Sequence, residues 1–332
     1  MLKRVSTAAA IACAAAALAL PATPAVADPA AGPATNDIVG VGDAHDQSAL
    51  TALAGTYNGQ ATTPADKLAS WDATGSTTIT PKAGCAPIER PRTSSEGIAA
   101  LQADASGCVD FARSVRPAAG GEESLAFMPY AYDGVSWLAG SVSNAPAGLS
   151  TADLAAIYTC TARTWQKVGG TSTAKIVPLL PPSGSELRDF FLSAIGVTKP
   201  GSCVGTGRDG TSFGTLARNV ITPASVPAFI RLGRSCPELR KYLRLGGIKT
   251  DDGSVVAPVK TDPAGQEVFN TGFPLEYQRP VYAVAKRDNG VLPARLASVF
   301  GPQGFTCSAA GQAAVVGQGF GSLSRGDGCG NP

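Results

Sequence analysis

Small polar residues stand at three places where an expected strand runs into the start of an expected helix. These places lie near Gly42, Ser94 and Ser185. The first N–H groups of a helix have no partner within the helix, and the helix dipole adds partial positive charge at that end. The three positions therefore favour an anion or another polar solute as a ligand.

Two motifs associated with catalysis or nucleotide binding lack the residues that their chemistry needs. Residues 210–214 read Gly-Thr-Ser-Phe-Gly and match the G-x-S-x-G pattern, which requires a histidine after the serine. The only histidine, His45, stands 167 residues before that serine. Beside Asp43 and Asp46, we interpret His45 as a surface-loop residue, with a residue of a ligand-binding loop as the alternative. Too few residues follow Gly317-Gln-Gly-Phe-Gly321 to build a nucleotide-binding unit. We expect no enzymatic activity, and a secreted hydrolase is the distant alternative.

Cysteine spacing favours disulfides over a metal site. No C-x-x-C pair and no cysteine–histidine cluster is present, so we expect neither a metal nor a cofactor. Seven cysteines follow the N-terminal apolar run, and the odd number leaves at least one unpaired, for which Cys236 is the candidate. Connectivity does not follow from spacing, but short loops flanked by turn residues favour three pairs: Cys85–Cys108, Cys160–Cys203 and Cys307–Cys329.

The N-terminus has the three parts of a secretory signal peptide. Lys3 and Arg4 precede an apolar run, and Ala25-Val-Ala27 provides a cleavage site, so residues 1–27 are expected to be removed. Residues 28–36, rich in Pro and Ala, then form a flexible leader. Cys13 fits a lipoprotein signal only loosely, so we expect a secreted, extracellular protein, with association with the cell envelope as the alternative.

Composition indicates a folded chain of about two domains rather than a fibrous or disordered one. The chain has 332 residues, of which 44% are hydrophobic, 16% charged and 21 aromatic. After removal of Lys3 and Arg4, 25 basic residues face 25 acidic ones, so the mature chain is neutral. A neutral chain has no electrostatic reason to bind nucleic acid or an anionic membrane.

The elements that position these residues alternate between strands and helices, which predicts an α/β fold with mostly parallel sheets. Apolar residues 125–139 are expected to contain a turn at Asp133-Gly134, and residues 200–225, rich in Gly and Thr, to form a loop. Strands are expected at residues 37–42, 67–71, 108–112, 175–180 and 279–285. Helices are expected around residues 50–57 and at 93–103, 150–158, 186–195, 293–299 and 309–316. Thr93 and Glu96 form a capping-box pattern at the start of the second helix, and Ser150, supported by Asp153, is expected to cap the third.

Five segments in order carry a resemblance to a known family. The mature chain resembles the type 2 periplasmic-binding-protein superfamily, in the branch containing phosphate-binding proteins of ABC importers. It is similar in particular to secreted actinobacterial substrate-binding-domain proteins. The segments are Ile38-Val-Gly-Val-Gly42, Pro91-Arg-Thr-Ser-Ser-Glu-Gly-Ile98, Val109-Asp-Phe-Ala-Arg-Ser114, Leu149-Ser-Thr-Ala-Asp-Leu-Ala-Ala-Ile-Tyr158 and Pro182-Ser-Gly-Ser-Glu-Leu-Arg-Asp-Phe-Phe191.

The resemblance implies a two-lobed fold with mixed sheets flanked by helices and two crossover strands. Lobe one would comprise residues 37–127 plus 270–332, and lobe two residues 128–269. A small solute such as phosphate would bind in the cleft of a monomer, and the partner would be an ABC-importer permease. Carried over by position, the ligand-binding residues are Gly42, Asp43, Ser94, Ser95, Ser114, Ser185 and Arg188.

Two departures from the family pattern bear on the ligand. Phosphate binders have a carboxylate after the serine of the third segment, where this chain has Val115. Glu186 and Leu187 replace the Gly-Thr of the fourth segment. A glutamate about 4 Å from an anion costs about 1–4 kcal/mol. The alternative is that Glu186 is simply a favourable acidic residue in the first turn of the helix. Arg113, Arg116 and Arg188 either restore positive charge or form surface salt bridges.

Two functions follow as predictions. The first is a secreted solute-binding protein of ABC-importer type for phosphate or a similar small oxyanion or polar solute. The alternative is a secreted, envelope-associated interaction or structural protein on the same scaffold, with a cleft that no longer binds.

Overall fold

The computed structural model describes residues 28–29, 32–61 and 66–332, so the predicted signal peptide lies outside the described residues. The chain divides into two compact units. The inserted unit is Gly134–Gln278, and the flanking unit combines the described residues up to Asp133 with Arg279–Pro332. The divisions fall after residues 133 and 278, whereas the lobes were expected to divide after residues 127 and 269.

The flanking unit is built on a mixed sheet. Strand β1 pairs in parallel with β2 and β5, whereas β5 and β16 are antiparallel. The sheet is therefore mixed, as the family resemblance implies, rather than mostly parallel, as the alternation of strands and helices predicts. Strand β17 pairs antiparallel with β6. The strands are β1 (Ile38–Gly42), β2 (Leu68–Ser70), β5 (Phe111–Ser114), β6 (Leu125–Gly140), β16 (Gln278–Lys286) and β17 (Gly321–Ser322), with a separate hairpin of β3 (Thr78–Ile79) and β4 (Ile88–Glu89).

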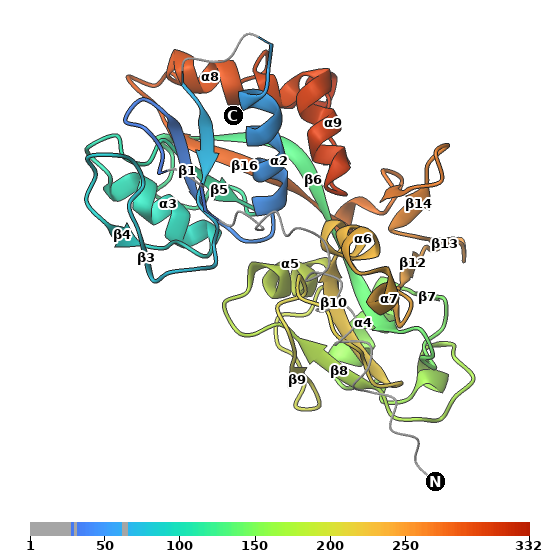
Figure 1. Ribbon diagram of the computed structural model, residues 1–332. Helices are drawn as coiled ribbons and strands as arrows, with labels where there is room; N and C mark the ends of the chain where they lie inside the picture. Colours follow the sequence, from blue (N-terminus) through green and yellow to red (C-terminus); the bar gives the residue numbers. More distant parts are fainter. Residues whose placement is uncertain (1–27, 30–31, 62–65) are drawn as a thin grey trace. The chain divides into compact units, whose positions relative to one another are not determined.

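Helices cover this sheet with apolar faces that the sequence pattern predicts. Helices α2 and α9 lie side by side (Figure 1). Leu50 and Leu53 of α2, Phe300 of α8 and Val315 of α9 are all buried in one cluster with the sheet. The helices are α2 (Gln47–Asn58), α3 (Ser94–Ala103), α8 (Ala294–Phe300) and α9 (Ala309–Gly317), with 3-10 turns η3 (Phe305–Cys307) and η4 (Arg325–Asp327).

The turn expected at Asp133-Gly134 is wrong, because β6 continues through it as one strand of 16 residues. Asp133 is fully buried and accepts hydrogen bonds from Nε and Nη2 of Arg279 at 2.9 and 2.8 Å. Gly134 makes room for a ring, since a Cβ there would stand 2.3 Å from Cε2 of Phe269. Asp and Gly usually indicate a turn, but within this strand Asp133 binds Arg279 and Gly134 leaves room for the ring of Phe269.

The inserted unit has its own mixed sheet in the order β6-β10-β8-β9, with β11 also pairing with β6. The loop expected over residues 200–225 is partly wrong, because residues 220–225 form β10 between β6 and β8. The sheet strands are β8 (Val177–Leu180), β9 (Gly205–Thr206), β10 (Val220–Ser225) and β11 (Leu243–Leu245). The smaller sheets contain β7 (Gly148–Leu149), β12 (Gly247–Lys249), β13 (Val255–Val256), β14 (Val259–Thr261) and β15 (Glu267–Phe269).

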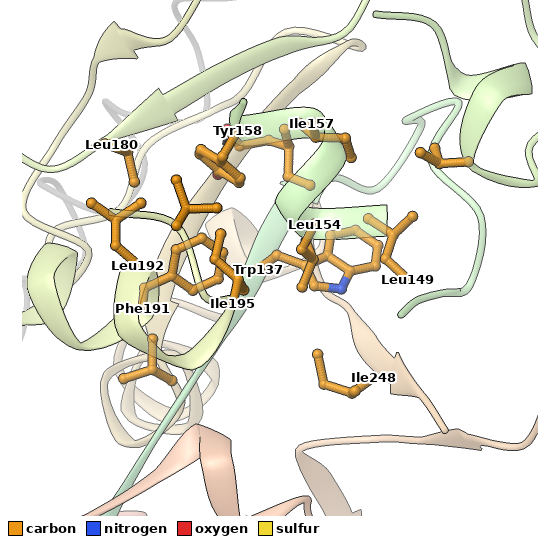
Figure 2. Packing of buried hydrophobic residues seen from close by; sticks show 14 of the residues in the cluster. Trp137, Leu149, Leu154, Ile157, Tyr158, Leu180, Phe191, Leu192, Ile195 and Ile248 are labelled. Atoms are coloured by element: carbon orange, nitrogen blue, oxygen red, sulfur yellow. Dashed lines mark hydrogen bonds between the residues drawn. The ribbon is translucent and has the colours of Figure 1, made fainter. Parts of the chain in front are cut away.

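The core of the inserted unit gathers around Trp137 of β6 (Figure 2). Its indole N–H donates to the Gly247 carbonyl at 3.0 Å, so the buried ring has no unsatisfied donor. Tyr158 and Phe191 meet edge to face with ring centres 5.1 Å apart. The helices are α4 (Thr151–Tyr158), α5 (Glu186–Ala194), α6 (Val226–Ser235) and α7 (Pro237–Arg240), with 3-10 turns η1 (Trp165–Val168) and η2 (Leu275–Tyr277).

Disulfides join the three preferred cysteine pairs. Each closes a loop within one unit: Cys85–Cys108 and Cys307–Cys329 in the flanking unit and Cys160–Cys203 in the inserted unit. The expectation of a free Cys236 is wrong, because this residue is disulfide-bonded as well. Sequence spacing misses this bond because the other six described cysteines pair among themselves.

The stretch expected to be a flexible leader has a fixed contact at its start. Both carboxylate oxygens of Asp28 accept hydrogen bonds from the buried guanidinium of Arg90, at 2.6 and 2.8 Å. Arg90 also donates to the backbone oxygens of Asp72 and Ser76. Asp28 is therefore held against the flanking unit.

Candidate functional site

The first and third predicted segments meet at one edge of the flanking unit's sheet. Strands β1 and β5 are parallel, and Gly42 pairs with Arg113, so the residues that follow both strands lie together. Gly42 has a φ of +126°, and a Cβ there would stand 2.7 Å from the Arg113 carbonyl oxygen. Asp43 follows directly and is 2% exposed.

The second segment reaches the same edge through the start of α3. The Thr93 hydroxyl accepts a hydrogen bond from the Glu96 N–H at the start of this helix, as the sequence predicts. Gly97 packs directly on Gly42, because a Cβ on Gly97 would stand 2.7 Å from the Gly42 Cα. Ser94, fully buried, accepts a hydrogen bond from the Val115 N–H at 3.0 Å.

The three predicted serines of the flanking unit all bond to the segment after β5. Ser114 donates to the Arg116 carbonyl at 2.7 Å, and exposed Ser95 accepts from Nε of Arg116 at 3.2 Å. Arg116 forms a two-pronged ion pair with Glu122, at 2.7 and 2.9 Å. These hydrogen bonds from Arg116 are the main cause of the lowered pKa of Glu122. Ser95 is the one of these serines that faces solvent.

Arg113 is neither a surface salt bridge nor an exposed source of positive charge. Its side chain is fully buried, and Nε lies 3.3 Å from Oδ1 of Asp46. Its N–H groups also donate into the ends of β1 and β2 and the residues that follow. The acceptors are the carbonyls of Asp43 (3.0 Å), Gly42 (2.9 Å) and Trp71 (2.7 Å) and the hydroxyl of Ser70.

His45 is 8% exposed, so its interpretation as a surface-loop residue is wrong. Its ring Nδ1 lies 2.9 Å from Oδ1 of Asp43, and the same carboxylate oxygen accepts the His45 backbone N–H at 2.7 Å. Burial lowers the pKa of His45, but the charge and hydrogen bond of Asp43 raise it by more, so the pKa is raised overall. The short Asp43–His45 spacing closes a local turn that buries the ring.

Asp46 is a buried carboxylate that the sequence analysis did not single out as a site residue. It is fully buried, and its Oδ2 accepts the Tyr130 hydroxyl at 2.9 Å. Burial raises the pKa of Asp46 to about 7, although Arg113 acts in the opposite direction. The grouping of two aspartates and one histidine directly after a buried strand was the sequence signal for this cluster. Its contact with Tyr130 was not predictable, because Tyr130 stands 84 residues away in the chain.

The fourth predicted segment lies in the inserted unit, at the start of α5. Ser185 caps this helix by accepting the Arg188 N–H at 3.5 Å, and Nη1 of Arg188 donates to the Pro181 carbonyl at 2.9 Å. Leu187, which replaces the family's threonine, is fully buried in the core of this unit. Ser185 and Arg188 are therefore brought together, while Leu187 serves packing.

Two classes of feature are not found within the described ranges. No group of three or more His, Cys, Asp or Glu side chains among these residues is placed to hold a metal ion. None of the helices there combines the length and the apolar character needed to cross a membrane.

One mixed α/β unit is inserted into the sequence of another, and serine- or threonine-capped helices begin after strands in both, an arrangement that is typical of solute-binding proteins. A family model described as a PBP superfamily domain matches residues 27–250, and the chain belongs to this superfamily. Its fold is that of the type 2 periplasmic-binding proteins. A search of curated protein sequences found no match.

Two solved structures illustrate the likeness in fold. One is an ABC-type phosphate transport receptor from Vibrio cholerae, 17% identical, with a TM-score of 0.55 over 86% of this chain and 99% of the other. The second is a putative phosphate ABC transporter substrate-binding protein with bound phosphate from Clostridium perfringens. It is 18% identical, with a TM-score of 0.59 over 87% of this chain and 100% of the other.

Proposed function

We propose that this protein is a secreted solute-binding protein that delivers a small polar solute to an ABC importer. The observation that carries the proposal is the meeting of Gly42, Asp43 and the start of α3 at the ends of β1 and β5. The PBP superfamily match and the phosphate receptors of similar fold support it. The predicted signal peptide and the three disulfides support export to an oxidising compartment.

Phosphate or a similar small oxyanion is the first ligand to test. Each unit by itself supplies hydrogen-bond donors that suit oxygen ligands: the flanking unit at the start of α3 with the exposed hydroxyl of Ser95, and the inserted unit at the start of α5 with Ser185 and Arg188. The arginines near α3 have little capacity left for a ligand, because Arg113 is fully buried with its N–H groups donating to backbone carbonyls and Arg116 is paired with Glu122. The donors of the flanking unit therefore favour a weakly charged oxyanion or a neutral polar solute over a doubly charged anion.

Thermal unfolding of the dialysed mature protein with millimolar phosphate tests this proposal, with sulfate as the control. A ligand at a hundred times its dissociation constant stabilises the folded state by about 2.7 kcal/mol. For units of this size, we expect a rise of roughly 5–10 °C in the unfolding temperature. A rise with phosphate and none with sulfate supports phosphate, and no rise with either moves the proposal to another polar solute.

Variants test the assignment of residues. Ser95→Ala and Arg188→Ala are each expected to weaken ligand binding, because both remove a donor at a helix start. Ser106→Ala and Arg218→Ala are matched controls, since both side chains are exposed and lie outside the predicted set. Unchanged affinity in the first two variants contradicts the site.

A second candidate function is an envelope-associated interaction or structural protein whose site does not bind a solute. Val115 in place of the family's carboxylate and the internal pairing of Arg113 and Arg116 favour it. Solute binding separates the two candidates. Saturable binding in equilibrium dialysis with phosphate, sulfate or a neutral polar solute supports delivery to a permease, and no binding of any of them supports the second candidate.

A further inference from the structure

The inserted unit contains a cavity that none of the predicted ligand-binding residues lines. It measures about 290 Å³ and lies between β6, β8, β10 and the segment from Thr206 to Leu216. Leu138, Leu179 and Phe213 make its walls apolar, and Leu138 belongs to a buried cluster against which Phe213 packs. A volume near 300 Å³ lies at the small end of the range for pockets that hold small molecules.

The G-x-S-x-G motif that failed as a hydrolase signature forms one wall of this cavity. Ser212 donates its hydroxyl to Asp209 at 3.2 Å, and Asp209 also accepts the N–H groups of Thr211 and Ser212 at 2.9 and 2.8 Å. Although burial raises the pKa of Asp209, these hydrogen bonds lower it by more. The carboxylate therefore stays ionised and braces the loop, and the motif builds a wall rather than a nucleophile.

Thr222, one of the residues that line this cavity, carries a buried hydroxyl without a hydrogen-bond partner among the described residues. Thr222 of β10 is 9% exposed, and its Oγ1 lacks a partner within the described part of the chain. This hydroxyl lies beside the loop, 3.6 Å from where a Cβ on Gly207 would stand. A buried polar atom without a partner costs free energy that a suitable ligand recovers.

An arginine at the same loop supplies charge. Arg208 is exposed and lines the cavity, and its guanidinium lies 3.4–3.6 Å from where a Cβ on Gly214 would stand. No carboxylate among the described residues forms an ion pair with it. The neighbouring Asp209 is occupied by the backbone of its own loop.

We propose that this cavity binds a small monocarboxylate with an apolar tail. The carboxylate pairs with Arg208 and accepts the Thr222 hydroxyl, and the tail occupies the apolar interior. A guanidinium and a hydroxyl donor suit a carboxylate, while the walls exclude a fully polar solute such as phosphate. The proposal does not rest on the solute site, because it uses none of the predicted ligand-binding residues.

Calorimetric titration of the full mature protein with octanoate tests the proposal, with 1-octanol and octylamine as uncharged and cationic controls. We expect saturable binding of octanoate that is at least about tenfold tighter than that of either control, because one charge-assisted hydrogen bond accounts for such a factor. Arg208→Ala should weaken octanoate binding by a similar factor, and Arg218→Ala should leave it unchanged. Equal affinity for 1-octanol, or unchanged binding in Arg208→Ala, overturns the proposal.

The Thr222→Val variant distinguishes a ligand-binding role of the Thr222 hydroxyl from a purely structural one, because the two roles predict different effects on stability and on octanoate binding. Valine keeps the shape but removes the hydroxyl without a partner, so the free protein should unfold at the same or a higher temperature. Octanoate should nevertheless bind more weakly to this variant. A variant that loses stability, or that binds octanoate as tightly as the unaltered protein, contradicts the assignment of Thr222.

Discussion

The guanidinium of Arg113 binds acceptors inside the protein, although Arg113 lies in a segment that was expected to contact a ligand. Its guanidinium binds the ends of β1 and β2 from a position at the end of β5. A buried guanidinium is tolerated only when its N–H groups find acceptors, and here backbone carbonyls supply most of them. The consequence at this scale is a rigid edge for the loops that carry Gly42 and Asp43.

Asp46 makes the stability of the protein depend on pH. Burial raises the pKa of Asp46 to about 7, whereas an unfolded aspartate titrates near pH 4. The folded state therefore binds a proton more tightly, so the stabilisation is complete below about pH 4 and is lost as the pH rises through about 7. Across this window Asp46 should lower the free energy of unfolding by up to about 4 kcal/mol.

Urea unfolding of the unaltered protein and of Asp46→Asn at pH 5 and pH 8 measures this effect. Asparagine stays neutral, so the variant should gain stability relative to the unaltered protein as the pH rises. Asp72, whose pKa burial raises to about 6, titrates in both proteins and cancels in the difference. A difference that does not change between the two pH values would refute the role of Asp46.

At the scale of elements, β6 depends on a residue without a side chain. Gly134 lies in the middle of this strand, and the ring of Phe269 from β15 occupies the space where its Cβ would be. Central strands usually lose stability through glycine, so its presence here reflects the close approach of that ring. The requirement for glycine at position 134 of β6 therefore comes from a contact with β15, which lies far along the chain.

Gly134→Ala is expected to destabilise the inserted unit by about 1–3 kcal/mol, because the new Cβ overlaps Phe269. Gly55→Ala is the matched control. Gly55 lies in helix α2 with nothing near its added Cβ, so alanine should stabilise by about 0.5–1 kcal/mol. Denaturant unfolding measures both. Equal effects of the two substitutions would be incompatible with this account of β6.

At the scale of the whole molecule, each described disulfide staples one unit alone. Replacing Cys160 and Cys203 by alanine should lower the stability of the inserted unit by about 3–4 kcal/mol, since a long loop regains freedom when unfolded. Amide hydrogen exchange should show the loss within Gly134–Gln278. The Cys307→Ala/Cys329→Ala variant should place its loss in the flanking unit, and losses spread evenly over both units would contradict this separation.

Local signals made the helix starts predictable. Thr93, Ser150 and Ser185 each accept an N–H from the third residue of their helix, because a cap needs only its immediate neighbours. Even so, Glu96 reaches the Arg92 N–H rather than completing the expected capping box with Thr93. The capping box at Ser150 and Asp153 forms as predicted.

Long-range partners decided what the sequence did not predict. The sequence of β10, with Thr222 and Pro223 in its middle, is typical of a loop. It forms a strand because β6 and β8 pair with it on either side. Arg113 reached its acceptors Ser70 and Trp71 across 43 and 42 residues, so its burial was not visible in its own segment. The local sequence therefore predicted which segments carry the candidate site residues, but it did not predict which partner each charged side chain would bind.

The pairing of β5 with β16 in the flanking unit has a consequence for biosynthesis. Ser114 of β5 pairs with Tyr282 of β16, and the whole inserted unit is translated between them. The inserted unit, one uninterrupted stretch, has all its residues available while the flanking sheet still lacks an inner strand. The sheet of the flanking unit is complete only after β16 has been translated. The flanking unit, whose translation begins first, is therefore the last to finish folding.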